Sequence, residues 1–349
     1  MTSARQTLEQ LLDRRDLTEA EAAELLNALA SGDTAPALAG AVLAALRAKG
    51  VTAAEVRGFA GAMRALARKP PLPVPLDAID IVGTGGDASG SLNLSTGAAL
   101  LTAACGMPVV KHGNRSISSR CGSADLIEQL GLAMPLAETE AARCFEATGF
   151  TFLFAPYFHP AMKAIAPVRA ALGVRTVFNL LGPLTNPAAP RFGLIGAYDQ
   201  ETAAIMADTL AGMDIARAWV VHGAAGWDEA TPIGPFLAYE VAAGRVSRRR
   251  VDPRDLGLAP CTSADLKGGD AADNAAALTA VFEGRDRGAH LSALVLQSGL
   301  ALHIAGRAES IAAGIESAQR AIAGGRAAAW LTHFQTVAAQ LSAAGDARA

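Results

Sequence analysis

Cysteine is scarce in this sequence and is not arranged for a disulfide or a metal. The four cysteines among 349 residues are dispersed, and none belongs to a CxxC pair or has a histidine partner nearby. This spacing argues against a secreted disulfide scaffold or a metal-binding thiol cluster. We expect reduced, mostly buried thiols in a cytoplasmic protein, none of them catalytic, at Cys105, Cys121, Cys144 and Cys261.

Long apolar runs and strong net charge are also missing. Every stretch of about eighteen apolar residues contains polar or charged breaks, and the N-terminus MTSARQTLEQ has no apolar signal core, so neither a membrane span nor export is expected. The net charge is −3, whereas a general nucleic-acid binder is usually basic. Charged residues make up only 18% of the chain, which argues against long disordered segments.

The first seventy residues have the pattern of a small all-helical domain. Capping boxes at Thr18 and Thr52 open two helices, and Pro36 opens a third helix that Gly50 closes. The run KPPLPVP at 69–75 is extended and stiff, so it marks a boundary. We therefore divide the chain into a helical domain, residues 1–70, and a larger domain, residues 71–349.

The larger domain alternates short apolar strands with helices. This alternation predicts an α/β domain with a mainly parallel central sheet, and a cleft between it and the helical domain. Ligands of such sheets bind beyond the carboxyl ends of the strands. The basic run Ser247–Arg250 is expected at a solvated hairpin edge, far from the motifs below. The predicted strands are 78–82, 107–110, 152–154, 194–196, 218–221 and 294–296.

The stretch from Asp80 to Glu128 is organised as two strand–loop junctions. The first strand is followed by glycines and by an apolar helix with hydroxyls at its start, which suits a phosphate. The second strand leads into KHGNR and a serine-rich loop at 116–123. One such junction alone would more simply be a tight turn, but two together indicate a highly phosphorylated ligand. Neither a dinucleotide fingerprint nor a P-loop is present.

A pair of adjacent carboxylates follows a later predicted strand, within HGAAGWDE at 222–229. Taken alone, Asp228 and Glu229 would fit a solvated acidic turn. Beside two phosphate loops, a magnesium site explains them better, because Mg²⁺ prefers one or two carboxylates together with water and phosphate oxygens.

These motifs resemble those of the anthranilate phosphoribosyltransferase family. The resemblance is carried by GTGGD, NLST and KHGNRSISSRCGSADLIE, and by FLFAPYFHPAMKAIAPVRAALGVRTVFNLLGPLTNP. It covers residues 5–335 in long, ungapped motifs. It implies transfer of a phosphoribosyl group from phosphoribosyl pyrophosphate to the amine of anthranilate, in tryptophan biosynthesis. It also implies a homodimer formed through the helical domain, onto which the segment 161–186 crosses back to pack.

The resemblance also implies roles for particular residues. No residue is expected to act as a general acid or base. Magnesium, with two ions expected per subunit, would be held by Ser95, Asp228 and Glu229. Anthranilate would be bound by Gly83, Asn114, Arg169, His112 and His159. The residues implied for phosphoribosyl pyrophosphate are Gly83, Gly86, Asp87, Ser91, Asn93, Leu94, Ser95, Thr96, Lys111, His112, Gly113, Asn114, Arg115, Ser116, Ile117, Ser118, Ser119 and Ser123.

Arg169 is the best candidate for binding the acceptor, whose amine could donate to the amide oxygen of Asn114 while Gly83 allows close approach of the backbone. A planar guanidinium can hold a carboxylate through two hydrogen bonds, which lysine does less well. The alternative interpretation of Arg169 is an ion pair on a helix surface. The alternative for His112 and His159 is a structural role in the core.

The sequence departs from the family pattern at Phe158, Trp227 and Gln297, which leaves room for a different aromatic acceptor. A nucleoside phosphorylase of the same fold is one alternative, but a nucleobase needs no carboxylate clamp. A non-catalytic nucleic-acid-binding relative is another, but it predicts a basic surface and lost metal carboxylates.

Overall fold

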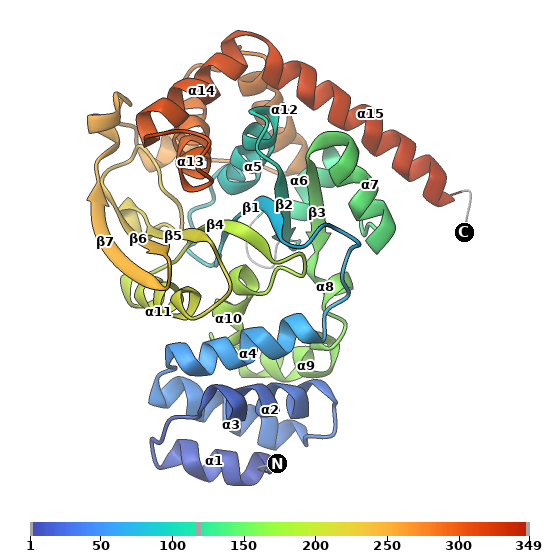
Figure 1. Ribbon diagram of the computed structural model, residues 1–349, viewed down its shortest axis with the longest axis vertical. Coiled ribbons are helices and arrows are strands. Elements are labelled where there is room, and N and C mark those ends of the chain that lie inside the picture. Colours follow the sequence, from blue (N-terminus) through green and yellow to red (C-terminus); the bar gives the residue numbers. More distant parts are fainter. Residues whose placement is uncertain (1–2, 116–119, 347–349) are drawn as a thin grey trace.

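The N-terminal part of the chain is a bundle of four helices. The computed structural model describes residues 3–115 and 120–346. The expected capping boxes at Thr18 and Thr52 are confirmed, as is the helix that begins at Pro36 and ends at Gly50. The helices are α1 (Ala4–Leu12), α2 (Glu19–Ala30), α3 (Pro36–Lys49) and α4 (Ala53–Ala65) (Figure 1).

The larger part of the chain contains a seven-stranded sheet, in the order β3-β2-β1-β4-β5-β6-β7. The first five strands in the chain pair in parallel, and β6 and β7 add an antiparallel hairpin at one edge. A helical domain plus an α/β domain with a mainly parallel sheet is therefore confirmed. The strands are β1 (Leu76–Gly83), β2 (Val109–Gly113), β3 (Phe150–Phe154), β4 (Pro190–Gly196), β5 (Arg217–His222), β6 (Phe236–Ala242) and β7 (Arg245–Val251).

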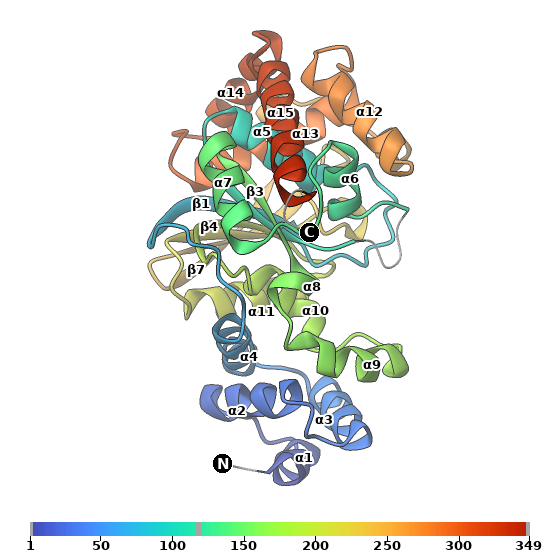
Figure 2. The ribbon, with the colours of Figure 1, turned by 90° about the vertical axis from the view of Figure 1, so that its right-hand side faces the viewer.

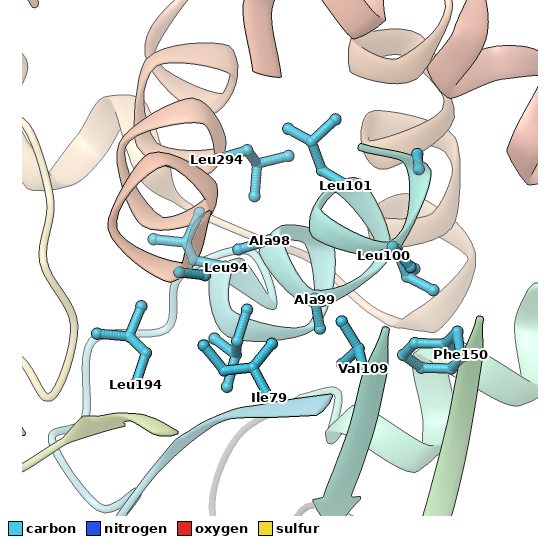
Figure 3. Packing of buried hydrophobic residues seen from close by; sticks show 14 of the residues in the cluster. Ile79, Leu94, Ala98, Ala99, Leu100, Leu101, Val109, Phe150, Leu194 and Leu294 are labelled. Carbon is cyan, nitrogen blue, oxygen red and sulfur yellow. The ribbon is translucent and has the colours of Figure 1, made fainter. Parts of the chain in front are cut away.

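Seven helices cover the face of the sheet that lies away from the helical bundle (Figures 1 and 2). Helix α5 is enclosed almost completely. It packs on strand residues such as Ile79 and Val109 from one side and on Leu294 of α13 from the other (Figure 3). Its start is thereby held at the carboxyl end of β1. The helices are α5 (Leu94–Ala104), α6 (Ser123–Gln129), α7 (Glu138–Thr148), α12 (Ala271–Phe282), α13 (Ala289–Ile304), α14 (Ile311–Ala323) and α15 (Arg326–Asp346).

The other face of the sheet shares its core with the helical bundle. Buried side chains of α2, α3 and α4 belong to one cluster with Ile195, Val220 and Val241 of the sheet. The segment that includes α9 and α10 contributes Ile165 and Phe178 to this cluster, and α9 lies beside α2 and α3 (Figure 2). The elements on this side are α8 (Ala155–Phe158), α9 (Met162–Leu172), α10 (Phe178–Leu181) and α11 (Gln200–Ala211).

Two predicted strands need correction. Residues 294–296 are not a strand but lie inside α13, which is buried on nearly all sides. A short apolar run cannot by itself distinguish a buried strand from a buried helix. The strand predicted at 107–110 instead spans Val109–Gly113, so Lys111 and His112 belong to the sheet ladder opposite Phe152 and Leu153.

Other expectations agree with the structure. The run Ser247–Arg250 lies in the exposed edge strand β7 of a hairpin. Within the part of the chain that the structure describes, none of the four cysteines forms a disulfide. Throughout residues 3–115 and 120–346, every helix is too short or too polar to cross a bilayer.

The close packing of α4 on α2 makes a stability prediction possible. A Cβ atom at Gly58 would lie 2.2 Å from the Glu19 carbonyl oxygen, whereas at Gly61 nothing described lies within 4 Å. Gly58→Ala should therefore lower the free energy of unfolding by about 1–3 kcal/mol through overpacking. Gly61→Ala on the same helix should be neutral or stabilising by up to ~1 kcal/mol, because alanine favours helix. Urea denaturation of both variants measures this, and equal losses would contradict the packing argument.

Candidate active site at the carboxyl ends of the parallel strands

The sequence motifs meet at one edge of the sheet. Strands β1, β2, β4 and β5 are parallel, so their carboxyl ends, at Gly83, Gly113, Gly196 and His222, lie along the same edge. The glycine loop (residues 83–90) follows β1 and leads to α5, while the acidic loop (residues 223–229) follows β5. This is the edge at which α/β sheets bind ligands.

The two carboxylates of the acidic loop connect it to the glycine loop and to α5. The backbone N–H of Gly85 donates to Asp228 Oδ2 at 2.5 Å, and the N–H of Asp228 donates to Asp87 Oδ2 at 3.4 Å. Glu229 accepts from the N–H of Ser95 at 3.3 Å and from the side-chain amide of Gln297 on α13. Ser95, Asp228 and Glu229, predicted as metal ligands, are thus brought together.

This arrangement requires glycine at the ends of β1 and β4 and directly after β5. A Cβ atom at Gly83 would lie 2.3 Å from Asp228 Oδ2, and one at Gly196 would lie 1.5 Å from the Asp228 carbonyl oxygen. At Gly223 it would lie 2.0 Å from the Glu229 carbonyl oxygen. The acidic loop therefore packs directly against the backbone at the carboxyl ends of these strands.

The site concentrates negative charge in a buried setting. Burial, together with the neighbouring Asp87, raises the pKa of Asp228 to about 7, and burial together with Asp228 raises that of Glu229 to about 8. Lys111 is a fully buried cation, and burial lowers its pKa although the negative charges of Asp80, Glu229 and Asp228 oppose that shift. Its ammonium donates to the Ile81 carbonyl inside the sheet. Lys111 is thus buried within the sheet, with its ammonium hydrogen bonded to the main chain.

The donor set fits magnesium better than a metal bound by protein alone. In the part of the chain that the structure describes, no group of three His, Cys, Asp or Glu side chains could hold a metal ion. Two carboxylates and a hydroxyl beside a glycine loop leave positions for water and phosphate oxygens, which Mg²⁺ prefers to retain. Carboxylates whose pKa values are raised by burial and by neighbouring negative charge are stabilised in their ionised form by a nearby divalent cation.

The start of α5 supplies backbone and hydroxyl groups but not every predicted side chain. Leu94 and Thr96 are buried, and Ser95 is partly exposed beside Glu229. The amide of Asn93 is engaged elsewhere, donating to the Cys121 carbonyl at 3.0 Å and accepting from Asn274 at 2.9 Å. It therefore connects the start of α5 to Cys121 in the loop after β2 and to Asn274 of α12. Ser91 forms an isolated β-bridge with Lys267. Its hydroxyl is hydrogen bonded to the hydroxyl of Ser89, with the two oxygens 3.2 Å apart.

The second loop, after β2, is described only at its ends. Ser116, Ile117, Ser118 and Ser119 lie outside the described residues. Asn114 is exposed, and its carbonyl accepts from the Ser123 hydroxyl at 3.0 Å. Arg115 forms an ion pair with Asp125, at 2.9 Å, and with Glu128 of α6, so its guanidinium is held by carboxylates of this chain.

Arg169 on α9 is a partly buried cation without a carboxylate partner among residues 3–115 and 120–346. Its guanidinium carbon lies 5.1 Å from the centre of the Phe178 ring, and burial lowers its pKa. A half-buried guanidinium lacking an acid is a candidate receptor for a ligand carboxylate. The surface ion pair considered for it from the sequence does not form with any residue that the structure describes.

The two histidines form a buried, neutral pair. The rings of His112 and His159 meet edge to face with their centres 5.0 Å apart, and His112 Nδ1 is 3.0 Å from the Gly182 carbonyl oxygen. Burial lowers the pKa of His112 to about 3 and that of His159 to about 4. Neither ring is therefore charged at neutral pH.

Sequence reasoning overlooked several residues that shape the site. Asn186 of the GPLTNP turn donates to Asp80 Oδ2 at 2.9 Å and to the Val110 carbonyl at 2.8 Å, joining that turn to β1 and β2. Gln297 was noticed only as a departure, and the structure makes it a donor to Glu229. Phe158 and Trp227, the other departures, are buried in the hydrophobic core.

Comparison with known proteins places this fold and site among the glycosyl transferases. The helical bundle domain model of the glycosyl transferase family matches residues 5–67, and the family's a/b domain model matches residues 76–328. An anthranilate phosphoribosyltransferase from Rubrobacter xylanophilus is 42% identical, over 98% of this chain and 99% of the relative. The chain belongs to the anthranilate phosphoribosyltransferase family.

Solved structures agree with this assignment. The anthranilate phosphoribosyltransferase from Thermus thermophilus superposes with a TM-score of 0.89 at 40% identity, covering 95% of this chain and 99% of that one. The Saccharomyces cerevisiae enzyme in complex with phosphoribosyl pyrophosphate and magnesium has a TM-score of 0.82 at 26% identity, covering 97% of this chain and 94% of that one.

The raised pKa values predict how stability depends on pH without ligands. A carboxyl group whose pKa is higher in the folded than in the unfolded protein stabilises the fold when protonated, and this contribution is lost as pH rises through the folded pKa. Between pH 7 and 9, wild type should therefore lose about 1–2 kcal/mol more stability than Glu229→Gln.

Urea denaturation in EDTA at both pH values measures this difference. The histidines do not contribute in this window, because their lowered pKa values affect stability only below about pH 7. Asp77→Asn, at an exposed carboxylate paired with Arg191, is the control and should behave as wild type. The same pH dependence in wild type and Glu229→Gln would show that Glu229 is not a buried acid.

Proposed function

We propose that this protein transfers the phosphoribosyl group of phosphoribosyl pyrophosphate to the amine of anthranilate, giving N-(5-phosphoribosyl)anthranilate and pyrophosphate in tryptophan biosynthesis. The observation that supports this proposal best is the acidic pair Asp228–Glu229, which is hydrogen bonded to the glycine loop and to the start of α5. The family relatives carry this name, and yeast relatives are solved with phosphoribosyl pyrophosphate and magnesium and with 4-fluoroanthranilate.

The donor is proposed to bind between the glycine loop and the second loop. Gly83, Gly86 and Asp87 would line it, and the backbone at the start of α5 would face its phosphates. Backbone N–H groups, hydroxyls and cations are sufficient to recognise a ligand with this many phosphate oxygens. The second loop, from Gly113 to Ser123, would complete the enclosure. Lys111 and Arg115 would act mainly through their charge, since both already have partners within the chain.

Magnesium is proposed to be held by Ser95, Asp228 and Glu229, with two ions per subunit. When bound, it would neutralise charge that builds on the departing pyrophosphate. Gln297 and the N–H of Ser95 orient the Glu229 carboxylate, while the N–H of Gly85 orients that of Asp228. These bonds fix the carboxylates before the metal arrives, which lowers the entropy lost on binding.

The acceptor is proposed to bind through its carboxylate to Arg169, with the amine near Asn114 and the backbone of Gly83. His112 and His159, both neutral, would provide uncharged ring surface and polar atoms rather than a second positive charge. A single cation without an acidic partner then selects a monoanionic aromatic acid.

The chemistry follows from positioning and charge. As pyrophosphate leaves, C1′ of the ribose gains oxocarbenium character, and the aryl amine attacks from the opposite face with inversion. The resulting aryl ammonium is acidic enough to lose its proton without a strong general base, and none is assigned. Orientation of the two substrates and stabilisation of the leaving group therefore account for catalysis.

The proposed organisation has a helical domain, residues 1–70 joined by 161–186, and an α/β domain, residues 71–349, with the substrates in a cleft between them. The shared core of α9 and α10 with the bundle supports the first unit. Assembly as a homodimer through the helical domain and a cytoplasmic location stay predictions, for sedimentation and cell fractionation to test.

The acceptor clamp predicts a selective kinetic defect. Arg169→Ala should raise the KM for anthranilate about 10- to 100-fold, because it removes charge-assisted hydrogen bonds to the substrate carboxylate. The KM for phosphoribosyl pyrophosphate should change little. Loss of anthranilate fluorescence on adding phosphoribosyl pyrophosphate and Mg²⁺ measures both. Lys163→Ala, an exposed cation on the same helix, is the control.

Each outcome of that assay is informative. If wild type consumes anthranilate but Arg169→Ala keeps the wild-type KM, the clamp is wrong. If wild type releases pyrophosphate only with other aromatic amines, the donor chemistry stands and the acceptor changes. If no amine reacts, the transferase function itself is wrong.

The metal site predicts a calorimetric result that does not depend on turnover. Titration of pyrophosphate in the presence of Mg²⁺ should show binding to wild type and a strong loss for Glu229→Gln. Gln297→Ala should weaken Mg²⁺-dependent binding about 10- to 100-fold, as removal of groups that orient metal ligands commonly does. Ser298→Ala is the matched control, because its hydroxyl donates to the Ala98 carbonyl of α5 instead. Unchanged binding in Gln297→Ala would show that this amide does not support the site.

A further inference from the structure

Arg175 joins the glycine loop to the rest of the protein from an unexpected direction. It lies in the short link between α9 and α10, on the side of the helical bundle (Figure 2). Its guanidinium donates through Nη2 to the Gly86 carbonyl and lies over the ring of Tyr198, with the guanidinium carbon 3.8 Å from the ring centre. Tyr198 follows β4, so one side chain connects two loops at the carboxyl edge of the sheet.

The backbone of the same residue is held by the helical bundle. Arg47 at the end of α3 donates through Nη1 to the Arg175 carbonyl at 2.8 Å. Nearby, the Thr176 N–H donates to Asn179 Oδ1 at 2.9 Å, and Phe178 packs on Phe59 of α4 with ring centres 6.0 Å apart. Arg175 therefore projects from a segment anchored to the bundle.

The glycine loop needs such an anchor. Gly85 and Gly86 adopt φ values of +71° and +78°, a region in which glycine has great freedom to move. On one side the loop is held by Asp228, which accepts from the Gly85 N–H. On the other side, in the described residues, the side-chain contact is the one from Arg175 to the next residue, Gly86. Two adjacent peptides are thus held by the acidic loop and by the bundle-side segment.

We propose that Arg175 is a positioning residue that latches the glycine loop to the helical bundle, so that the donor-binding backbone is in place only when the two parts of the molecule are docked. This inference rests on the proposed function, because it takes the loop as the donor site. The guanidinium has five donors in a planar fork, so it can stack on Tyr198 and hold Gly86 together.

The test combines kinetics with a measurement that needs no turnover. Arg175→Ala should lower kcat/KM for phosphoribosyl pyrophosphate at least about tenfold, the effect of losing one charge-assisted hydrogen bond, with KM for anthranilate within about twofold. Amide hydrogen exchange of ligand-free protein should be faster at residues 84–90 and unchanged in the bundle. Arg191→Ala is the control, because this exposed arginine also pairs with an acid, Asp77, and lies near an aromatic ring, Phe192. It should match wild type in the kinetics and in the hydrogen exchange.

Further variants separate a latch from a general structural role. Tyr198→Phe keeps the ring and should retain wild-type kinetics. Tyr198→Leu should reproduce part of the Arg175→Ala defect, and the double variant Arg175→Ala/Tyr198→Leu should lose less activity than the sum of the two single losses. Arg175→Lys should rescue only partly, because an ammonium cannot stack and donate as a planar fork. Unchanged exchange at residues 84–90 in Arg175→Ala, or equal losses for both substrates, would overturn the latch. Because exchange is measured without substrate, it remains decisive even if wild type fails to turn over anthranilate.

Discussion

Two carboxylates seated on strand backbone are the constraint around which this structure is arranged. Asp228 and Glu229 can occupy the carboxyl edge of the sheet only because β1 and β4 end in glycine and a glycine directly follows β5, at positions where no Cβ fits. Burying two acids side by side is costly unless donors and a cation compensate. Backbone N–H groups of the glycine loop and α5 supply the donors. A divalent cation bridging to a phosphorylated ligand would supply the remaining charge.

The hydrophobic core serves this edge directly. Helix α5 is clamped between the sheet and α13, so the position of its first turn, which faces the acidic loop, is set by packing on both sides (Figure 3). Helix α13 in turn carries Gln297 to Glu229. A largely apolar, buried helix thus delivers one polar side chain, Gln297, to the site. This explains why a segment with the composition of a core element contributes to chemistry.

The helical bundle contributes to the site through the segment that returns to it between β3 and β4. That segment carries Arg169, with its guanidinium beside Phe178, and Arg175, which contacts the glycine loop. The acceptor and donor halves of the proposed reaction are therefore connected through one short stretch of chain. Its contacts with both parts make relative motion of the bundle and the sheet a physical route to coupling donor and acceptor binding.

The sequence alone determined the fold class, the two glycine- and hydroxyl-rich strand–loop junctions and the acidic pair, because glycine patterns, caps and alternating apolar runs are local signals. It failed for residues 294–296, where a buried helix and a buried strand share one composition, and for the bounds of β2, whose longer ladder carries Lys111 into the interior. Only the tertiary structure brought Gln297 to Glu229 and Arg175 to Gly86. Those contacts join residues 68 and 89 positions apart in the chain, and no local pattern encodes such a distance.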